Sequence, residues 1–326
     1  MTDMEASALV QLATTKLRCN QREIAEKLNV SPTQISKWKK GEHLSEDMRD
    51  KLRALAAIGQ HHADFVLRVG CVDDADKWKK VIDRLAANAD EDSETGYSTY
   101  FFLDEEDVRR DLCSLTFSAL DGIGLTIPAK FPSELDMEFD EEDEGAAEEY
   151  DRLLNEHPVT HTIAKLFKAT SNLSGFNSAY IQYLLDDDKL ELWDTDAVNI
   201  EPCLIELAST KIAIEEQLAP TQAVVRRRLS ADYVRWLTIV KDRAFRAGVP
   251  LRAELLDLVY GSDEAAGHEA EAESLGFNDN RIHPDVYMNE LLVGMRIIHQ
   301  VLPAILAKLG IADQFELDHS KLYLRD

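Results

Sequence analysis

Two helix starts, separated by one short turn, constrain the N-terminal part of this chain more than any other feature. The stretch reads QREIAEKLNVSPTQISKWKKGE and occupies residues 21–42. Asn20 is a suitable N-cap and Glu23 follows three residues later, which predicts a capping box at the start of a helix over 21–28. Asn29 then stands where a helix end favours a residue in the left-handed conformation, so we expect the first helix to end there.

The second helix has the stronger start signal. Ser31 is a favoured N-cap, and Pro32 occupies the first helical position, where its missing N–H would have no partner in any case. Gly41 is suited to end this helix. The flanking segments 5–18 and 45–58 carry apolar residues at helical spacing. Together these signals predict a compact bundle of four helices around a helix-turn-helix.

The same stretch resembles the DNA-binding domain of the Cro/C1-type, or xenobiotic-response-element, helix-turn-helix family. The resemblance covers about residues 5–58 and rests on the ISKW run and on Gln21, Ala25, Ile35 and Gly41. It implies a lambda-repressor-like bundle, with the helix from Pro32 to Lys40 in the major groove of double-stranded DNA.

The resemblance also assigns DNA contacts by position. The base-reading positions are Pro32, Thr33, Ser36 and Lys37, and the phosphate-binding positions are Gln21, Arg22, Lys39 and Lys40. Lys37 could donate to guanine O6 and N7, and the Thr33 methyl could contact thymine. Pro32 replaces a polar reader of some family members and offers only apolar contact, which predicts limited base readout. Trp38 follows Ile35 at helical spacing, so we expect it to pack in the core rather than to stack on nucleic acid.

Charge is distributed unevenly, which matters because DNA is a polyanion. The 326 residues carry a formal net charge of −25. Residues 1–58 hold ten basic and eight acidic side chains, whereas residues 88–149 hold three basic and twenty acidic ones. The acidity therefore lies mainly outside the segment that the resemblance assigns to DNA.

Helical patterns dominate beyond residue 59, so we predict an all-α fold in which the helix-turn-helix bundle precedes a mostly helical C-terminal region. Two short strands are expected at 98–103 and 123–127. The predicted parts are a DNA-binding domain over 1–58, a connecting domain over 59–133, an acidic loop or linker over 134–150, and an oligomerisation or effector domain over 151–326. Helices are expected near 62–69, 74–89, 105–120, 146–156, 159–170, 176–186, 197–218, 221–247, 251–259 and 284–309.

The acidic run over 134–150 has ten acidic side chains in its first sixteen residues and no basic ones. One interpretation is a solvated loop, because like charges at this density repel. Another is an autoinhibitory mimic that competes with DNA for a basic surface. The basic segment 221–252 predicts an amphipathic helix, with its outer side either solvated or in contact with nucleic acid or acidic peptide. Two ion pairs are expected on it, Arg228–Asp232 and Asp242–Arg246.

The most apolar segment lies at 291–310. Arg296, His299 and Lys308 interrupt it, which predicts a buried helix rather than a membrane span. Its apolar face is a candidate for the core or for a dimer interface, and comprises Leu291, Leu292, Met295, Ile298, Leu302 and Ile305.

No enzyme motif is evident, and we expect neither a cofactor nor a bound metal. The chain has no phosphate-binding loop, no nucleophile elbow and no dinucleotide glycine pattern. His157 and His161 stand four apart, but Pro158 between them indicates a helix start and no glutamate completes a zinc-protease motif. Four widely spaced cysteines and the lack of an export signal predict reduced thiols in a cytoplasmic protein.

These observations predict a DNA-binding transcription regulator, specifically a repressor, that acts as a homodimer on paired half-sites. One alternative is an antitoxin or phage-defence-type interaction protein, in which the acidic C-terminal region binds a protein partner. A second alternative is a helix-turn-helix domain fused to an unrecognised enzyme.

Overall fold

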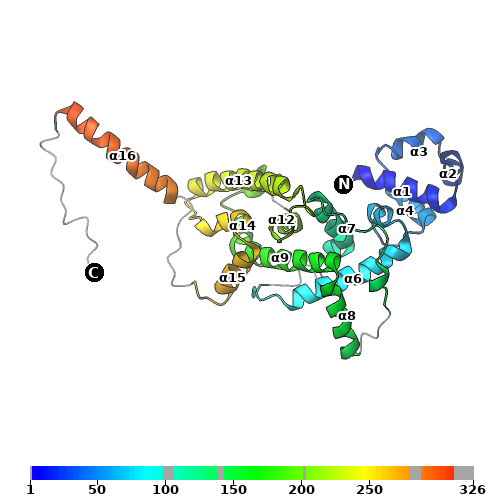
Figure 1. Cartoon of the computed structure of the whole chain (residues 1–326). Helices are drawn as coiled ribbons and strands as arrows, with labels where there is room; N and C mark the ends of the chain where they lie inside the picture. The colour runs from blue at the N-terminus through cyan, green and yellow to red at the C-terminus, as the bar shows by residue number, and fades with distance from the viewer. Residues whose placement is uncertain (1, 98–105, 138–142, 201–202, 279–287, 312–326) are drawn as a thin grey trace.

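Helices account for almost all regular structure in this protein. The computed structural model describes residues 2–97, 106–137, 143–200, 203–278 and 288–311. Within these ranges there are sixteen α-helices and three short 3-10 helices, and no β-strand. The all-α prediction is therefore confirmed. Figure 1 shows a small bundle (α1–α4), a larger body (α5–α15), and α16, which extends from the end of the body opposite to the bundle.

The helices have the following bounds. The bundle contains α1 (Thr2–Leu17), α2 (Gln21–Leu28), α3 (Pro32–Trp38) and α4 (Glu46–Ala56). The first half of the body contains α5 (Ala63–Val69), α6 (Val72–Glu91), α7 (Glu106–Gly122), η1 (Ser133–Leu135) and α8 (Glu144–Glu156). The second half contains α9 (Pro158–Tyr180), α10 (Gln182–Leu185), η2 (Leu192–Asp194), α11 (Ala197–Ile200), α12 (Leu204–Lys211), α13 (Gln222–Ala247), η3 (Ala253–Leu256), α14 (Asp257–Tyr260) and α15 (Asp263–Ser274). The last helix is α16 (Met288–Leu309).

The bundle is organised around α1, which packs against α4, α3 and α2 and also against α5 of the body. One apolar side chain from each bundle helix is fully buried: Leu9, Ile24, Ile35 and Leu52. Burial of each contributes roughly 1.5–3 kcal/mol. Trp38 is also buried, which confirms that it packs in the core.

The body is organised around α9, a helix of 23 residues that packs against α15, α12, α6 and α8. The sequence analysis predicted two helices here, over 159–170 and 176–186. Instead, one helix runs from Pro158 to Tyr180, and only the four-residue α10 follows. Gly175 does not end α9; it lies inside the helix, where a neighbouring segment packs closely against it.

Two glycines allow this close packing on α9. A Cβ atom at Gly175 would lie 2.5 Å from the side chain of Thr95, and one at Gly267 of α15 would lie 2.6 Å from Asn172 of α9. The buried residues of α15 are Ala266, Gly267 and Ala270. The sequence analysis missed α15, because its buried face consists of small residues and gives no strong apolar pattern.

An aromatic cluster joins α5, α6 and α7. The Phe117 ring lies 5.1 Å from Phe65 and 5.4 Å from Trp78, both in edge-to-face geometry. Trp78 also meets Phe131 at 5.1 Å. Each such pair contributes about 0.5–1.5 kcal/mol beyond burial of area. The cluster fixes α5, which contacts the bundle, to the rest of the body.

Segments 59–133 and 151–278, which were predicted to be separate parts, pack together through α6 with α9 and α7 with α12. The acidic run between them is also less loop-like than predicted. Leu135 and Tyr150 are buried, and α8 begins at Glu144. Residues 138–142, in the middle of the run, lie outside the described residues.

Ion pairs attach the start of the acidic run, and the residue directly after it, to α6. Lys77 pairs with Asp136, and this contact raises the pKa of Lys77. Arg84 pairs with Asp151 at 2.6 Å, and the hydrogen bond from Arg84 lowers the pKa of Asp151. These acidic groups are therefore already engaged with basic side chains of the body.

Some predicted details of the second half of the body were wrong. Residues 123–127, which follow α7, form no strand. The Ile123 carbonyl instead accepts a hydrogen bond of 3.1 Å from the N–H of Thr221, the residue before α13. The other predicted strand, at 98–103, lies outside the described residues. The single helix predicted over 197–218 is replaced by α11 and α12. The helix predicted over 251–259 is replaced by η3 and α14.

The basic helix α13 is amphipathic as predicted, with Leu229, Trp236 and Val240 buried. The Asp242–Arg246 ion pair is present at 2.9 Å. Arg228, however, pairs with Glu206 of α12 at 3.1 Å rather than with Asp232, because α12 packs against α13 and brings a second carboxylate within reach.

The chain has two further general properties. No helix in the described residues combines the length and apolar character needed to cross a membrane. All four cysteines are free thiols, and burial raises the pKa of Cys113 to about 12.

The close approach at Gly175 leads to a stability prediction. Gly175→Ala should lower the free energy of unfolding by about 1–3 kcal/mol, because the new methyl group meets Thr95 in a packed interior. Gly122→Ala is the matched control, since a Cβ atom there meets nothing within 4 Å. Urea unfolding followed by circular dichroism measures both. Equal stability of the two variants would contradict the close packing of α9.

Candidate nucleic-acid interface

The start of α2 has the predicted capping box. The Asn20 Oδ1 accepts hydrogen bonds from the N–H groups of Arg22, at 2.9 Å, and Glu23, at 3.1 Å. In return, the Asn20 N–H donates to the Glu23 carboxylate at 2.8 Å. Caps of this kind contribute about 1 kcal/mol, and this one fixes where α2 begins.

The turn after α2 is closed by backbone hydrogen bonds. Asn29 has φ 54° and ψ 46°, the left-handed conformation that was predicted. Its N–H donates to the Glu26 carbonyl at 3.2 Å, and the Val30 N–H donates to the Ala25 carbonyl at 2.9 Å. This pair of bonds is a Schellman motif, so the direction in which the chain leaves α2 is well determined.

A second Schellman motif follows α3. Gly41 has φ 85°, its N–H donates to the Trp38 carbonyl at 2.9 Å, and the Glu42 N–H donates to the Lys37 carbonyl at 3.1 Å. The motif brings Glu42 back beside Lys37, and their side chains form an ion pair of 3.3 Å. The sequence analysis did not identify this counter-ion, although Gly41 indicated the motif that brings it there.

The four predicted base-reading residues lie along α3. Ser31 caps this helix by accepting from the Gln34 N–H at 3.2 Å, and Pro32 is its first residue. Pro32, Thr33 and Lys37 are exposed, whereas Ile35 and Trp38 point into the core. Ser36 is half-buried. The exposed face of α3 thus offers one amine, one hydroxyl and apolar groups.

The predicted phosphate-binding residues lie at the two ends of this surface. Gln21, the first residue of α2, accepts a hydrogen bond from the Ser36 hydroxyl at 3.4 Å, which joins the start of α2 to the middle of α3. Arg22 is exposed and lies 3.8 Å from Glu26. Lys39 and Lys40 are exposed beyond α3. All eight predicted residues are therefore carried by α2, α3 and the turn that follows, on the outer side of the bundle in Figure 1.

Lys39 and Lys40 provide the least compensated positive charge on this surface. Neither makes an ion pair within the described part of the chain. The Ser7 hydroxyl of α1 donates a hydrogen bond to the Lys39 carbonyl at 2.9 Å, which attaches the backbone at Lys39 to α1. The lysine ammonium groups, by contrast, remain available to an anion.

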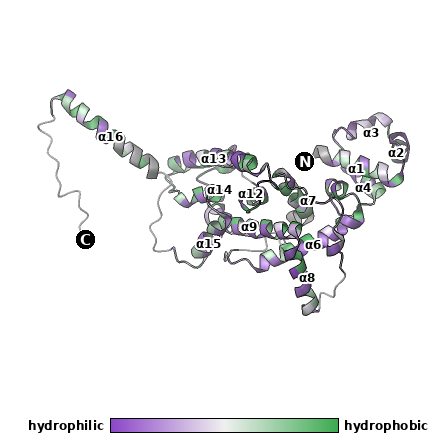
Figure 2. Cartoon of the chain, in the orientation of Figure 1, coloured by the Kyte–Doolittle hydropathy of each residue, from purple (hydrophilic) through white to green (hydrophobic). Residues whose placement is uncertain are grey.

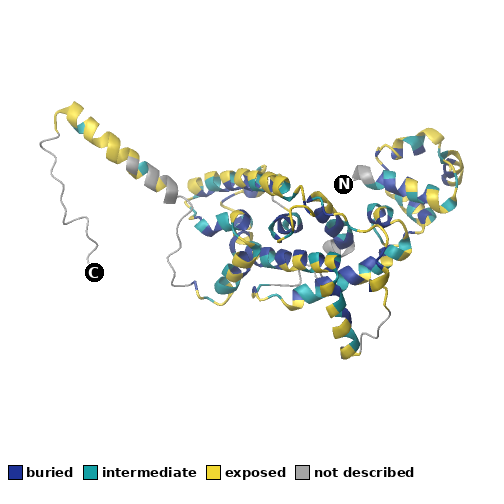
Figure 3. Ribbon diagram, viewed as in Figure 1, coloured by how far each residue is buried: buried dark blue, intermediate teal, exposed yellow. Residues whose placement is uncertain are grey.

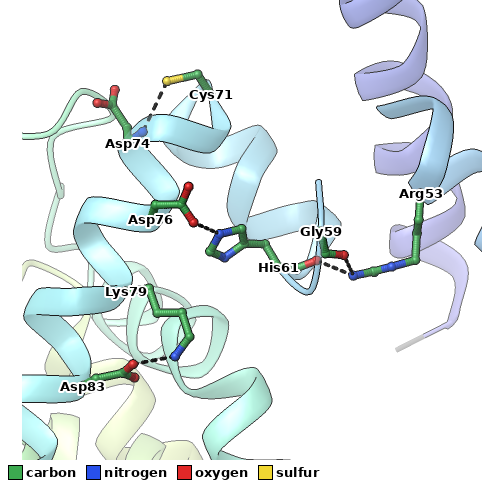
Figure 4. A network of polar contacts seen from close by, with 8 residues as sticks. All are labelled: Arg53, Gly59, His61, Cys71, Asp74, Asp76, Lys79 and Asp83. Carbon is green, nitrogen blue, oxygen red and sulfur yellow. Dashed lines mark hydrogen bonds and ion pairs between the residues drawn. The ribbon is translucent and has the colours of Figure 1, made fainter. Parts of the chain in front are cut away.

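A polar network connects the bundle to the body (Figure 4). Arg53 of α4 donates two hydrogen bonds, to the carbonyls of Gly59 at 2.9 Å and His61 at 2.8 Å. The His61 Nε2 lies 2.6 Å from a carboxylate oxygen of Asp76 on α6. Arg53 of α4 and Asp76 of α6 thus both bind the short segment that contains Gly59 and His61. The orientation of the bundle relative to the body depends on this segment. The sequence analysis did not predict this connection.

A cavity of about 450 Å³ lies beside this network, between the segment 57–62 and helices α5, α6 and α7. Its lining combines apolar groups such as Phe65 with Asp76, Lys79 and Cys113. Lys79 is paired with Asp83 at 2.6 Å, and Cys113 is a protonated thiol at neutral pH because burial raises its pKa to about 12. The cavity therefore has no free cation or thiolate among these groups.

The two histidines considered as a metal pair have other surroundings. Pro158 begins α9, as predicted, and His157 stands at the N-cap position with its ring 3.7 Å from Glu134. His161 is exposed one turn later. In the described residues, no three His, Cys, Asp or Glu side chains are grouped closely enough to hold a metal ion.

Comparison with known proteins found no matching family model, no matching curated protein and no matching solved structure.

The bundle–body connection gives a prediction for Arg53. Arg53→Ala should lower the free energy of unfolding by about 1–3 kcal/mol, because the two carbonyls and the Glu5 carboxylate lose their charged partner. Arg22→Ala, which removes only an exposed pair, should change it by less than about 1 kcal/mol. Chemical denaturation of both variants measures the difference. A loss for Arg53→Ala no larger than that for Arg22→Ala would contradict the role of Arg53.

Proposed function

We propose that the bundle of this protein binds double-stranded DNA and that the chain is a transcription regulator of the repressor class. In this proposal α3 enters the major groove with Pro32, Thr33, Ser36 and Lys37 towards the bases. Gln21, Arg22, Lys39 and Lys40 contact phosphates on either side. No enzymatic activity and no cofactor is part of the proposal.

The observation that carries the proposal is the construction of the α2–turn–α3 unit. Both helices end in Schellman motifs and begin at side-chain caps, and the turn between them is closed by the motif after α2 and the cap at Ser31. An α-helix with its side chains is about 10–12 Å across, which fits a major groove about 12 Å wide. The buried side of α3 anchors it, and its opposite side carries polar and basic groups.

The charge distribution supports the same proposal. The unit that would approach DNA is slightly basic, although the whole chain carries −25. Asp136 of the acidic run is paired with Lys77 on α6, and Asp151, directly after the run, is paired with Arg84. Repulsion between the acidic body and DNA is weakened by salt beyond about 10 Å, whereas the lysines would lie against the phosphates.

A homodimer on paired half-sites would supply the affinity that one small bundle lacks, because a single unit contacts few phosphates. A second candidate function is that of an interaction protein, such as an antitoxin or a phage-defence component. The large apolar exposure of α16 favours a role in assembly and is compatible with both candidates.

Selection of DNA from a random duplex pool tests the proposal. We expect the full-length protein to enrich a specific sequence at low salt. Lys37→Ala should then lose about 1–3 kcal/mol of discrimination at one base pair, since Lys37 would donate to guanine. Failure of the wild type to enrich any sequence, or to retain any duplex at low salt, would overturn the proposed function.

The double variant Lys39→Ala with Lys40→Ala is the matched comparison for Lys37→Ala. If these lysines contact phosphates, affinity should fall by a similar factor for every sequence. The slope of log K against log [salt] should become shallower by about 0.9 for each lost contact. Fluorescence anisotropy across a salt series measures both quantities. A change of base preference in this variant would show that the assignment to phosphates is wrong.

The ion pair between Lys37 and Glu42 leads to a separate prediction. Glu42→Gln should tighten DNA binding about two- to fivefold at low salt, because it releases Lys37 and removes a negative charge from the surface. Glu216→Gln makes the same charge change at an exposed site in the body and serves as the control. Equal affinities of the two variants would place Glu42 outside the interface.

A further inference from the structure

The helix α16 exposes more apolar surface than any other helix in the described residues. It extends away from the body (Figure 1), it is rich in hydrophobic residues (Figure 2), and nearly all of its described side chains are exposed (Figure 3). The sequence analysis predicted that this segment is buried, which is wrong for the single chain. Its apolar residues must therefore be explained by something other than the core of the same molecule.

The exposed residues form a regular seam. Leu291, Met295, Ile298, Leu302, Ile305 and Leu309 recur along α16 at alternating steps of four and three. Their exposed fractions range from 41% at Leu302 to 65% at Met295. Alternation of four and three over nearly three heptads is the pattern of a coiled-coil interface, in which these residues occupy the a and d positions. The seam is thus a surface suited to another helix of the same pattern.

We propose that α16 is a self-association helix, through which copies of this chain pack seam against seam into a helical bundle. The inference does not depend on DNA binding. It identifies the partner as further copies of the chain, because a helix with an a/d seam is self-complementary: the knobs of one copy fit the holes of the next.

The area of the seam is sufficient for specific association. Each of the six side chains presents on the order of 100 Å² of apolar surface. Two copies would then bury on the order of 1,000 Å² in total, which is the size at which specific interfaces begin. The seam extends over about 27 Å of helix, so contacts along its whole length are made together.

The charge of the segment argues against a lipid surface as the partner. Helices that lie on membranes carry a strongly charged polar face, whereas residues 291–311 contain only two charged residues, Arg296 and Lys308. Pro303 is compatible with the bundle, because it lies beside Gln300 and Ala307 on the side of the helix opposite to the seam.

The residues in the seam also favour an assembly larger than the single homodimer of the proposed function. The a positions are Met295, Leu302 and Leu309, and the d positions are Leu291, Ile298 and Ile305. Isoleucine at d with leucine at a favours three or four strands over two. Val301, which flanks the seam and is exposed, would widen the face in the same way.

The test is the mass of the full-length protein in solution without DNA, measured by sedimentation equilibrium over a range of concentrations. The wild type should have a mass that is a multiple of the 36.8 kDa chain. The seam variant, Ile298→Asn with Ile305→Asn, should dissociate to the single-chain mass, with association weakened about a hundredfold or more.

The outer-face variant, Gln300→Asn with Ala307→Asn, is the control and should keep the wild-type mass. It carries the same new residues seven positions apart on the opposite side of α16, and Asn is at least as unfavourable to a helix there as in the seam. A single-chain mass for the wild type would overturn the proposal, as would equal masses of the two variants. Binding of a single-chain wild type to phospholipid vesicles would instead assign the seam to a membrane surface.

These outcomes are separable from those for DNA binding, because mass is measured without DNA. If both proposals hold, the seam variant should bind DNA with weaker apparent affinity but unchanged base preference, since association of copies raises the local concentration of bundles.

Discussion

Packing against α9 is the constraint on which the body of this protein depends. Helices from both sides of the acidic run meet on this one helix. Gly175 and Gly267 allow the close approach of Thr95 and Asn172, because neither glycine carries a side chain. A methyl group at either position would meet a neighbour inside normal contact distance. Small residues thus allow α15 to pack closely on α9, and larger apolar residues fill the rest of the core.

The body in turn positions the bundle. The aromatic cluster around Phe117 holds α5, α1 packs on α5, and Arg53 and Asp76 hold the connecting segment from two sides. A bundle joined in this way presents α3 in one direction relative to the body. Asp136 of the acidic run, and Asp151 directly after it, are attached to α6 by ion pairs.

The candidate interface could be predicted largely from sequence because it is built from local signals. Caps, the left-handed Asn29 and the terminal Gly41 act between residues a few positions apart, so the eight predicted positions fall on α2, α3 and the following turn. The pairing of Lys37 with Glu42 and of Gln21 with Ser36 was missed. The Lys37–Glu42 pair follows from the local Schellman motif. The Gln21–Ser36 contact depends on the angle between α2 and α3, which the sequence does not give.

The sequence by itself determined the helical character of the chain, the limits of α2 and α3, and the presence of a long apolar helix near the C-terminus. These properties depend on neighbouring residues and on periodicity within one helix. Only the tertiary structure decided that α9 continues through Gly175, that the small-residue helix α15 packs on it, and that α16 stays outside the core. The physical reason is that periodicity shows which face of a helix is apolar, but which segment covers that face depends on contacts between residues far apart in the chain.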